Sequence, residues 1–230
     1  MKKITLVEII QLLLLILQTY FINSYPYYPK CSSFDRKTTI LKSLNGAIKG
    51  ACYTVTVDYG GQKPNKTNKV LNWLSVPYAQ PPIGSLRFRD PIPIRTWEGT
   101  LDGTQWPYNC VQWDGDYIDD YSSEDCLYLN IFVPYDTYYN SVIQNNATYR
   151  APIFVWVHGG SNNMGSVKDD TFEASTLVAL SEIIVVTINY RLGPFGFLTI
   201  LDTDAKGNQG FLNLIFEKIF VLSVKFPLFL

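Results

Sequence analysis

The fold is decided by the stretch IFVWVHGG, from Ile153 to Gly160, together with a second stretch, IIVVTIN, from Ile183 to Asn189. Both begin as continuous apolar runs rich in β-branched residues, a pattern typical of strands that are covered on both faces of a parallel sheet. Parallel strands need a crossover connection, and Asp170–Leu180, which lies between them, is long enough for a helix. The pattern therefore predicts an α/β fold rather than an all-β sandwich.

Shorter strand signals lie on the N-terminal side of this region. Thr39–Val57 alternates well enough for a hairpin, with Asn45-Gly46 as its turn. Asp58–Lys69 is polar, and we expect a flexible stretch there. Val70–Val76 and Leu127–Val133 are further strand candidates. Together these segments predict an N-terminal hairpin region followed by the first strands of the central sheet.

Composition excludes several classes of protein. Of the 230 residues 47% are hydrophobic and 17% are charged, which excludes a disordered chain. A net charge of −1 argues against a nucleic-acid partner, because phosphate binding needs a concentrated basic surface. The chain has a single histidine, His158, so a site built from two histidines is excluded within it. We expect no metal and no cofactor.

The first 24 residues read as a signal peptide rather than as part of a fold. Lys2 and Lys3 give a basic start, Ile9–Leu17 is apolar apart from one glutamine, and Ser24 is a small residue suited to a cleavage site. The alternative is a membrane anchor, but the apolar run is far shorter than the roughly 20 residues that a spanning helix needs. We expect a secreted chain that begins near Tyr25.

Two further features agree with the secretory pathway. Asn65 and Asn146 each begin an Asn-x-Thr sequon in a polar, turn-rich stretch, and we expect both to be glycosylation sites. We expect the chain to enter the secretory pathway and to be either secreted or held on the extracellular face of the plasma membrane.

The four cysteines are even in number, which predicts disulfides in an oxidising compartment. They are Cys31, Cys52, Cys110 and Cys126, and three pairings are possible. A zinc site is disfavoured because there is one histidine and no Cys-x-x-Cys. Val111–Asp125 is acidic and favours an exposed loop; closing it with a disulfide would stabilise the fold by about 3 kcal/mol.

The glycine pair after the first apolar run is a candidate functional site. His158, Gly159, Gly160 and Ser161 follow the predicted strand at the carboxyl edge of the sheet, where α/β folds place their sites. Paired glycines leave backbone N–H groups uncovered, and two such groups aimed at one point hold an oxyanion. The alternative is an ordinary turn between a strand and a loop, because so short a motif also occurs by chance.

Six motifs along the chain, taken together, resemble the successive signatures of type-B carboxylesterases, in the family's order and at compatible spacings from about Thr39 to Leu212. The motifs are SVPYAQPPIG from Ser75 to Gly84, LRF from Leu86 to Phe88, SEDCLYLN from Ser123 to Asn130, VWVHGG from Val155 to Gly160, INYRLG from Ile188 to Gly193 and GNQG from Gly207 to Gly210. The family includes cholinesterases, carboxylesterases and the catalytically inactive neuroligins. The resemblance implies an extracellular domain of α/β-hydrolase fold.

The resemblance also implies roles for individual residues. Cys110 and Cys126 match the family's first disulfide, and Arg87 and Glu124 match a structural ion pair. Without the resemblance, Arg87 and Glu124 would be interpreted as two ordinary exposed charges, since exposed ion pairs contribute only about 0 to 1 kcal/mol to stability.

The glycine pair also matches a family motif. Gly159 and Gly160 match the start of the oxyanion-hole loop. Active esterases typically have a third glycine next, whereas this chain has Ser161, which keeps its backbone N–H.

The catalytic residues are absent from these 230 residues. No Gly-x-Ser-x-Gly nucleophile motif occurs, and we expect His158 to support the loop rather than act as a base. The resemblance implies that residues 25–212 are the N-terminal part of the domain, with an incomplete α/β-hydrolase fold. The family continues with Asp-Gln where this chain has Asn213-Leu214, and we interpret residues 213–230 as a divergent tail from a truncated or mis-spliced gene model.

Two functions follow from the resemblance. The first is a non-catalytic, neuroligin-like adhesion module with an extracellular protein partner, which Ser161 and Lys206 favour. The alternative is a carboxylic-ester hydrolase that acts on a small ester and whose serine, acid and histidine lie outside these residues. In either case we expect no ester hydrolysis by this polypeptide alone.

Overall fold

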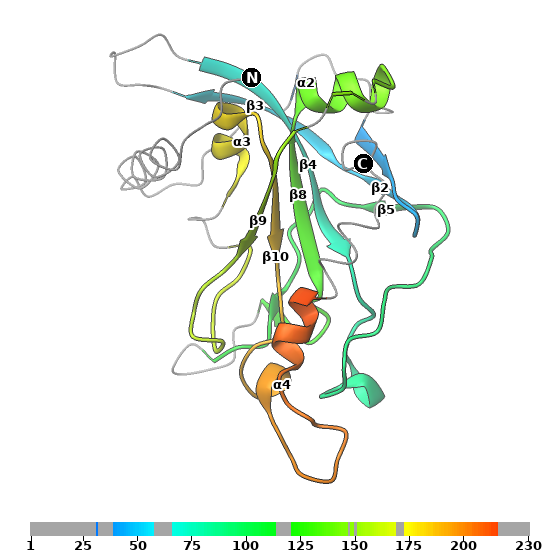
Figure 1. Ribbon diagram of the computed structural model, residues 1–230, viewed down its shortest axis with the longest axis vertical. Helices are drawn as coiled ribbons and strands as arrows, with labels where there is room; N and C mark the ends of the chain where they lie inside the picture. The colour runs from blue at the N-terminus through cyan, green and yellow to red at the C-terminus, as the bar shows by residue number, and fades with distance from the viewer. Residues whose placement is uncertain are drawn as a thin grey trace.

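The centre of the molecule is a five-stranded sheet with the strand order β3-β4-β8-β10-β9 (Figure 1). The computed structural model describes residues 31, 39–57, 66–113, 121–146, 148–149, 151–168 and 173–215. The strands of this sheet are β3 (Ala51–Val57), β4 (Lys66–Pro77), β8 (Tyr128–Pro134), β9 (Ile153–Val157) and β10 (Ile184–Ile188). The predicted signal peptide and Asn65 lie outside the described residues, as does the tail beyond residue 215.

The two stretches that decide the fold do form neighbouring parallel strands. Ile153 of β9 lies opposite Ile184 of β10, and Val157 lies opposite Ile188. The helix α3 (Ser175–Ser181) lies between them in the chain, which confirms the α/β class. The other three pairings in the sheet are antiparallel, so the sheet is mixed rather than wholly parallel.

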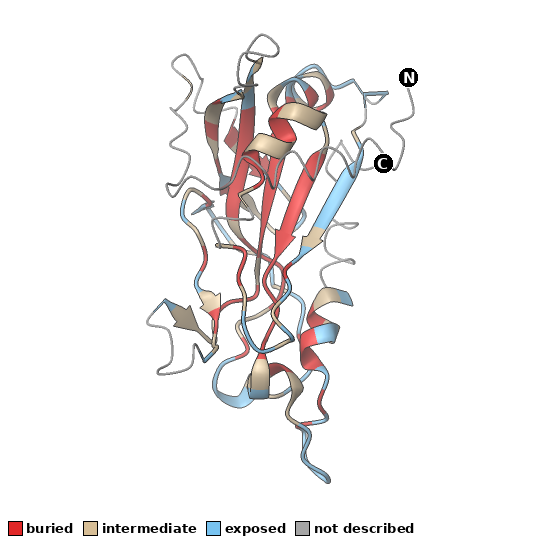
Figure 2. Cartoon of the chain, turned by 90° about the vertical axis from the view of Figure 1, so that its left-hand side faces the viewer, coloured by how far each residue is buried: buried red, intermediate tan, exposed pale blue. Residues whose placement is uncertain are grey.

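The prediction that both strands are covered on both faces holds for β10 and is wrong for β9. All five residues of β10 are buried. In β9 four of the five residues are exposed, and Val155 keeps 41% of its surface accessible. Figure 2 shows this strand in pale blue beside the buried strands. The reason is that neither hydrophobic cluster of the described residues includes a residue of β9, so the faces of this last strand stay uncovered.

A second, three-stranded sheet holds the predicted hairpin. Its strands are β1 (Ile40–Lys42), β2 (Ala47–Lys49) and β5 (Thr100–Asp102), in the order β1-β2-β5. The turn is confirmed, since the N–H of Ser43 donates to the carbonyl of Gly46. A Cβ on Gly46 would lie 2.3 Å from the ring of Trp97, so only glycine fits there. The hairpin ends at β2, and β3 joins the central sheet instead.

The remaining described elements are short. They are η2 (Gly84–Leu86), β6 (Asn109–Cys110), β7 (Ser122–Ser123), α2 (Tyr135–Tyr138), η3 (Tyr139–Ile143), α4 (Gly193–Phe197) and a helical stretch over residues 209–215.

Strand β4 begins at Lys66, four residues before the predicted start, so part of the expected flexible stretch is a strand. Its pairing with β8 is irregular between Trp73 and Val76, where Ser75 has a φ of +52°. The Oδ1 of buried Asn130 accepts the N–H of Ser75 at 3.1 Å. The irregular strand therefore keeps its hydrogen bonds satisfied through a side chain.

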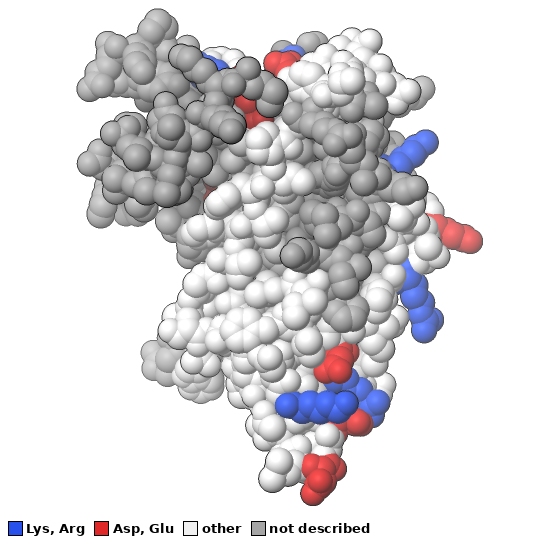
Figure 3. Space-filling model, viewed as in Figure 1, with Lys and Arg blue, Asp and Glu red and all other residues white. Residues whose placement is uncertain are grey.

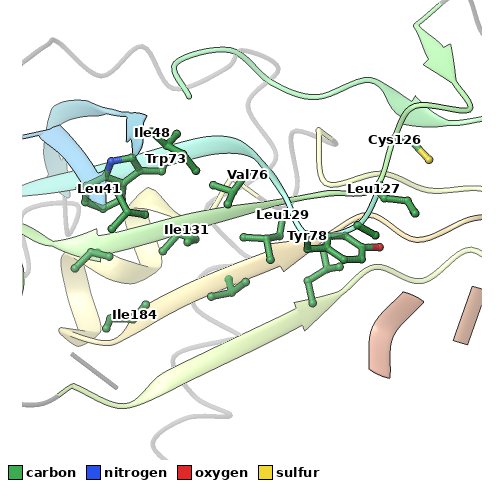
Figure 4. Close-up of a cluster of buried hydrophobic side chains, with 14 of the residues drawn as sticks. Leu41, Ile48, Trp73, Val76, Tyr78, Cys126, Leu127, Leu129, Ile131 and Ile184 are labelled. Atoms are coloured by element: carbon green, nitrogen blue, oxygen red, sulfur yellow. The ribbon is translucent and has the colours of Figure 1, made fainter. Parts of the chain in front are cut away.

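Hydrophobic clusters cover both faces of the central sheet from β3 to β10. The larger cluster joins β1 and β2 to one face, and Figure 4 shows Leu41, Ile48 and Trp73 packed together there. The Nε1 of Trp73 donates to the carbonyl of Thr39 at 2.7 Å, which ties the hairpin to the sheet. On the other face α3 packs through Val178 and Ala179. Burial on both faces is what the predicted layered α/β architecture requires.

We expect the stability of the fold to depend on pH through Glu173. Burial raises the pKa of this carboxyl to about 7, against the opposing effect of hydrogen bonds from Ser175. Because the pKa is raised in the folded state, the contribution of Glu173 to the stability of the fold is complete below the unfolded pKa of 4.5. This contribution is lost as the pH rises through 7. Glu173→Gln should therefore raise the free energy of unfolding at pH 8 by about 2 kcal/mol.

Urea denaturation at pH 4.5 and pH 8 measures this effect. The variant should lose most of the pH dependence between these values, whereas Glu98→Gln, at an exposed position, should leave it unchanged. Equal pH dependence in the wild type and in Glu173→Gln would contradict the prediction.

Candidate functional site

The glycine pair lies in a tight turn at the carboxyl end of β9. Gly160, Ser161 and Asn162 have consecutive positive φ angles of +120°, +54° and +62°. The carbonyl of Gly160 accepts the N–H groups of Asn163 and Met164 at 3.0 and 3.1 Å. A Cβ on Gly160 would lie 1.9 Å from the carbonyl oxygen of Met164, so the turn requires glycine at this position.

The backbone N–H groups of this turn are available to a ligand. In the part of the chain that the structure describes, those of Gly159, Gly160 and Ser161 donate no hydrogen bond. Gly159 and Ser161 are exposed, and apart from its two neighbours in the chain no described residue has an atom within 4 Å of a Cβ placed on Gly159. The sequence predicted these three residues as the oxyanion loop, and the structure places them together in one turn.

Planar peptide units set the direction of these N–H groups. In a trans peptide the N–H points away from the preceding carbonyl. The carbonyl of Gly159 lies 2.9 Å from the Nδ1 of His158, and the carbonyl of Gly160 accepts two N–H groups inside the turn. The N–H groups of Gly160 and Ser161 therefore point away from these contacts.

His158 supports the turn from inside the fold. Its side chain is buried, and its ring stacks on that of Tyr190 with the ring centroids 4.6 Å apart. The Tyr190 hydroxyl donates to the carbonyl of His158 at 3.1 Å. The imidazole is thus held within the protein rather than presented to solvent beside the free N–H groups.

Two residues that anchor the turn were not singled out from the sequence. Buried Asn189 accepts the N–H of Val167 through Oδ1 at 3.1 Å and donates to the carbonyl of Tyr108 through Nδ2 at 3.0 Å. Gln112 contacts Gly165 through both atoms of its amide. Asn189 belongs to the INYRLG motif, so the sequence could have identified it as a candidate. No motif includes Gln112, so nothing in the sequence gave a reason to select it.

The disulfides and the ion pair are present in the structure. Cys110 is bonded to Cys126, and Cys31 is bonded to Cys52, which resolves the pairing that the sequence left open. The Nε and Nη2 of Arg87 each donate to one carboxylate oxygen of Glu124 at 2.5 Å. This bidentate geometry is specific to arginine and holds the segment before Cys126 in place.

Other expected features lie apart from this turn. Asn146, a predicted glycosylation site, is exposed, and its Oδ1 accepts the N–H and hydroxyl of Thr148 in the same sequon. Among the described residues no helix is long and apolar enough to cross a membrane, and no cluster of acidic, cysteine or histidine side chains has the makings of a metal site. Figure 3 shows charged side chains of both signs scattered among the described residues of one face.

We expect Ser161→Gly to stabilise the protein. A side chain in the left-handed region costs roughly 1 kcal/mol, and glycine removes that cost. Because Ser161 has a φ of +54°, the free energy of unfolding should rise by about 1 kcal/mol in urea denaturation. The matched variant Ser181→Gly, at the end of α3, should be destabilising because glycine weakens a helix. A loss of stability in Ser161→Gly would show that the serine makes a favourable contact in the turn.

Comparison with known proteins identifies the family. The carboxylesterase family model matches residues 44–216, and the chain belongs to this family. It is 40% identical over 149 residues to para-nitrobenzyl esterase of Bacillus subtilis (strain 168), covering 63% of this chain and 28% of that protein. It is also 39% identical over 190 residues to pyrethroid hydrolase Ces2e of Rattus norvegicus, covering 78% of this chain and 30% of that protein.

A third relative has a similar match. Cocaine esterase of Oryctolagus cuniculus is 38% identical over 190 residues, covering 78% of this chain and 32% of that protein. The chain thus spans about 30% of the length of these relatives. The match to the carboxylesterase family implies the α/β-hydrolase fold, and the described strands and helices agree with an incomplete form of it.

Proposed function

We propose that this chain supplies the oxyanion-stabilising turn of a carboxylic-ester hydrolase that acts on small esters. The observation that carries the proposal is the turn after β9, whose three consecutive backbone N–H groups are free within the described part of the chain. Attack on an ester carbonyl places negative charge on its oxygen, and preorganised N–H groups stabilise that charge. The position agrees as well, because α/β folds bind substrates at the carboxyl ends of their strands.

In this mechanism Gly160 and Ser161 donate to the developing oxyanion. Their N–H groups point away from the carbonyls that are held inside the turn. Ser161 replaces the glycine that active members of the family typically have, but the donor is a backbone group and is retained. The serine side chain is exposed and changes the shape of the site without removing its charge stabilisation.

The nucleophile and its base come from outside these 230 residues. The sequence contains no Gly-x-Ser-x-Gly, and buried His158 is stacked on Tyr190. The outer edge of β9 pairs with no described strand, and its carboxyl end leads directly into the turn. A further strand parallel to β9 on that edge would end beside the oxyanion donors, which is where an attacking serine must lie.

The relatives favour hydrolysis over the adhesion function expected from the sequence. The three proteins named above are an esterase of p-nitrobenzyl esters, a pyrethroid hydrolase and a cocaine esterase by name. The adhesion hypothesis depended on Ser161 and Lys206. Lys206 is exposed and pairs through its backbone with Thr199, so it belongs to a separate loop from the turn.

We also propose that the protein is made in the secretory pathway. Two disulfides within the described residues fit an oxidising compartment. The exposed sequon at Asn146 and the predicted signal peptide at residues 1–24 point the same way. N-terminal sequencing of secreted material should find a chain that begins close to Tyr25, and recovery with Met1 still attached would contradict this.

The test of the enzymatic function compares this chain with the product of the complete gene, using p-nitrophenyl butyrate. The 230-residue chain alone should show no turnover above buffer. The complete product should hydrolyse the ester, and Gly160→Ala should lower kcat by about 100-fold, because its Cβ would collide with Met164 and turn the donors away. Gly99→Ala is the matched control, since Gly99 also has a positive φ but has open space around it.

Three outcomes would reject the proposal. One is a folded complete product without activity, which favours the adhesion module. Another is full activity in Gly160→Ala. The third is turnover by the 230-residue chain alone, because the chain has no nucleophile motif to account for it.

A further inference from the structure

We propose that Gln112 is a positioning residue for the oxyanion turn, acting through the backbone of Gly165. This inference rests on the proposed function for its catalytic consequence, but the contact itself is independent of it. Gln112 lies outside the turn, in the segment that follows Cys110, and it is 53 residues from Gly165 in sequence.

The contact is a two-point clamp. The N–H of Gly165 donates to the Oε1 of Gln112 at 2.7 Å, and the Nε2 of Gln112 donates to the carbonyl of Gly165 at 3.2 Å. A side-chain amide offers one acceptor and one donor on a single planar group, so it pairs with both polar groups of one residue. Alanine at this position would leave both groups of Gly165 without these partners.

Gly165 in turn packs against the first peptide of the turn. A Cβ on Gly165 would lie 2.4 Å from the Nδ1 of His158 and 2.5 Å from the carbonyl oxygen of Gly159. The backbone of Gly165 is therefore in close contact with that carbonyl. Because Gly159 C=O and Gly160 N–H belong to one rigid plane, whatever holds the carbonyl also sets the direction of the oxyanion donor.

The clamp connects the turn to the disulfide. Gln112 lies two residues after buried Cys110, and its Nε2 also lies 3.4 Å from the carbonyl of that cysteine. A second link is parallel to it, since the hydroxyl of Ser166 donates to the Oδ1 of Asn109. The residues on either side of Cys110, Asn109 and Gln112, thus hold Ser166 and Gly165, which follow the oxyanion turn in the chain.

The first experiment measures amide hydrogen exchange by NMR in the 230-residue chain. Gln112→Ala should speed exchange at Gly165 at least tenfold and shift the amide resonances of Gly160 and Ser161. Exchange in the buried strand β10 reports global stability and should stay within twofold. Gln144→Ala is the matched control, because Gln144 is exposed and its side chain makes no hydrogen bond in the described part of the chain.

A second variant keeps the test decisive if Gln112→Ala fails to fold. Gln112→Asn retains the amide but is one methylene shorter, so it cannot span both groups of Gly165. Amide exchange at Gly165 should be faster than in the wild type, by a smaller factor than in Gln112→Ala. Unchanged exchange at Gly165 in both folded variants, or equal increases at Gly165 and in β10, would overturn the clamp.

The second experiment measures ester hydrolysis by the complete gene product. Gln112→Ala should lower kcat about tenfold while KM changes less than twofold, because the donors act on the transition state rather than on the bound ester. An unchanged kcat, or a loss confined to KM, would overturn the positioning role. If the wild-type product hydrolyses no ester, the proposed function fails, and the exchange experiment still decides whether the clamp exists.

Discussion

Replacing both Cys110 and Cys126 with alanine is expected to lower the free energy of unfolding by about 3 kcal/mol, on the loop-entropy account of disulfides. The two cysteines are 16 residues apart in sequence and both are buried, so the bond itself lies in the core and closes a loop of moderate length. Urea denaturation of the oxidised wild type and of the double variant measures the difference. The same variant should also speed amide exchange at Gly165, because Gln112 is attached to this loop.

The other disulfide provides the control. Removing Cys31 and Cys52, which are 21 residues apart, should cost a similar free energy because the loop is of similar length. It should leave exchange at Gly165 unchanged, since no hydrogen bond joins that disulfide to the turn in the described residues. Equal effects of the two double variants on Gly165 would mean that the Cys110–Cys126 bond has no particular role in holding the turn.

The second large effect on the free energy of unfolding is expected from Asn213→Asp, which introduces a negative charge beside Arg191. Arg191 is 3% exposed and forms no ion pair within the described part of the chain. Its Nε donates to the Oδ1 of Asn213 at 3.1 Å, and its Nη1 donates to the carbonyl of Arg89 at 2.8 Å. The Nη2 of Arg191 and the Nδ2 of Asn213 are both buried and have no hydrogen-bond partner among the residues that the structure describes. Two donors are therefore left unsatisfied around one buried cation.

Burial lowers the pKa of Arg191 to about 10, against the raising effects of Tyr78 and Asp90. An aspartate at position 213 would replace the unpaired donor with an acceptor and give the guanidinium a carboxylate partner. Because a buried charge without a partner costs about 3 to 5 kcal/mol relative to a paired one, Asn213→Asp should raise the free energy of unfolding by about 3 kcal/mol. The sequence resemblance points to the same position, where the family has Asp.

Urea denaturation at pH 7 and pH 3 tests this prediction. An aspartate paired with Arg191 has a lowered pKa in the folded state, so the gain is present above the unfolded value of about 4 and declines as the pH falls below it. Asn145→Asp, at an exposed position with no side-chain partner in the described residues, should change stability by less than about 0.5 kcal/mol. A variant at position 213 that is less stable than the wild type at pH 7 would refute the interpretation.

Local patterns predicted much of the fold correctly. The apolar runs at Ile153–Val157 and Ile184–Ile188 are parallel neighbours, and Asn45-Gly46 forms the hairpin turn, because strand and turn preferences depend on adjacent residues. The same patterns could not show that β9 is exposed. An apolar run is the same whether its strand is central or at an edge, and the sheet order alone decides which it is.

The candidate site divides in the same way. The sequence determined the family, the strand that leads into the turn, and the residues Gly159, Gly160 and Ser161, since a glycine pair after a buried strand is a local signal. Only the tertiary structure decided that Gln112 clamps Gly165 and that Asn213 leaves Arg191 incompletely paired. These contacts join residues 53 and 22 positions apart, and such pairings are set by how the chain packs rather than by any short pattern within it.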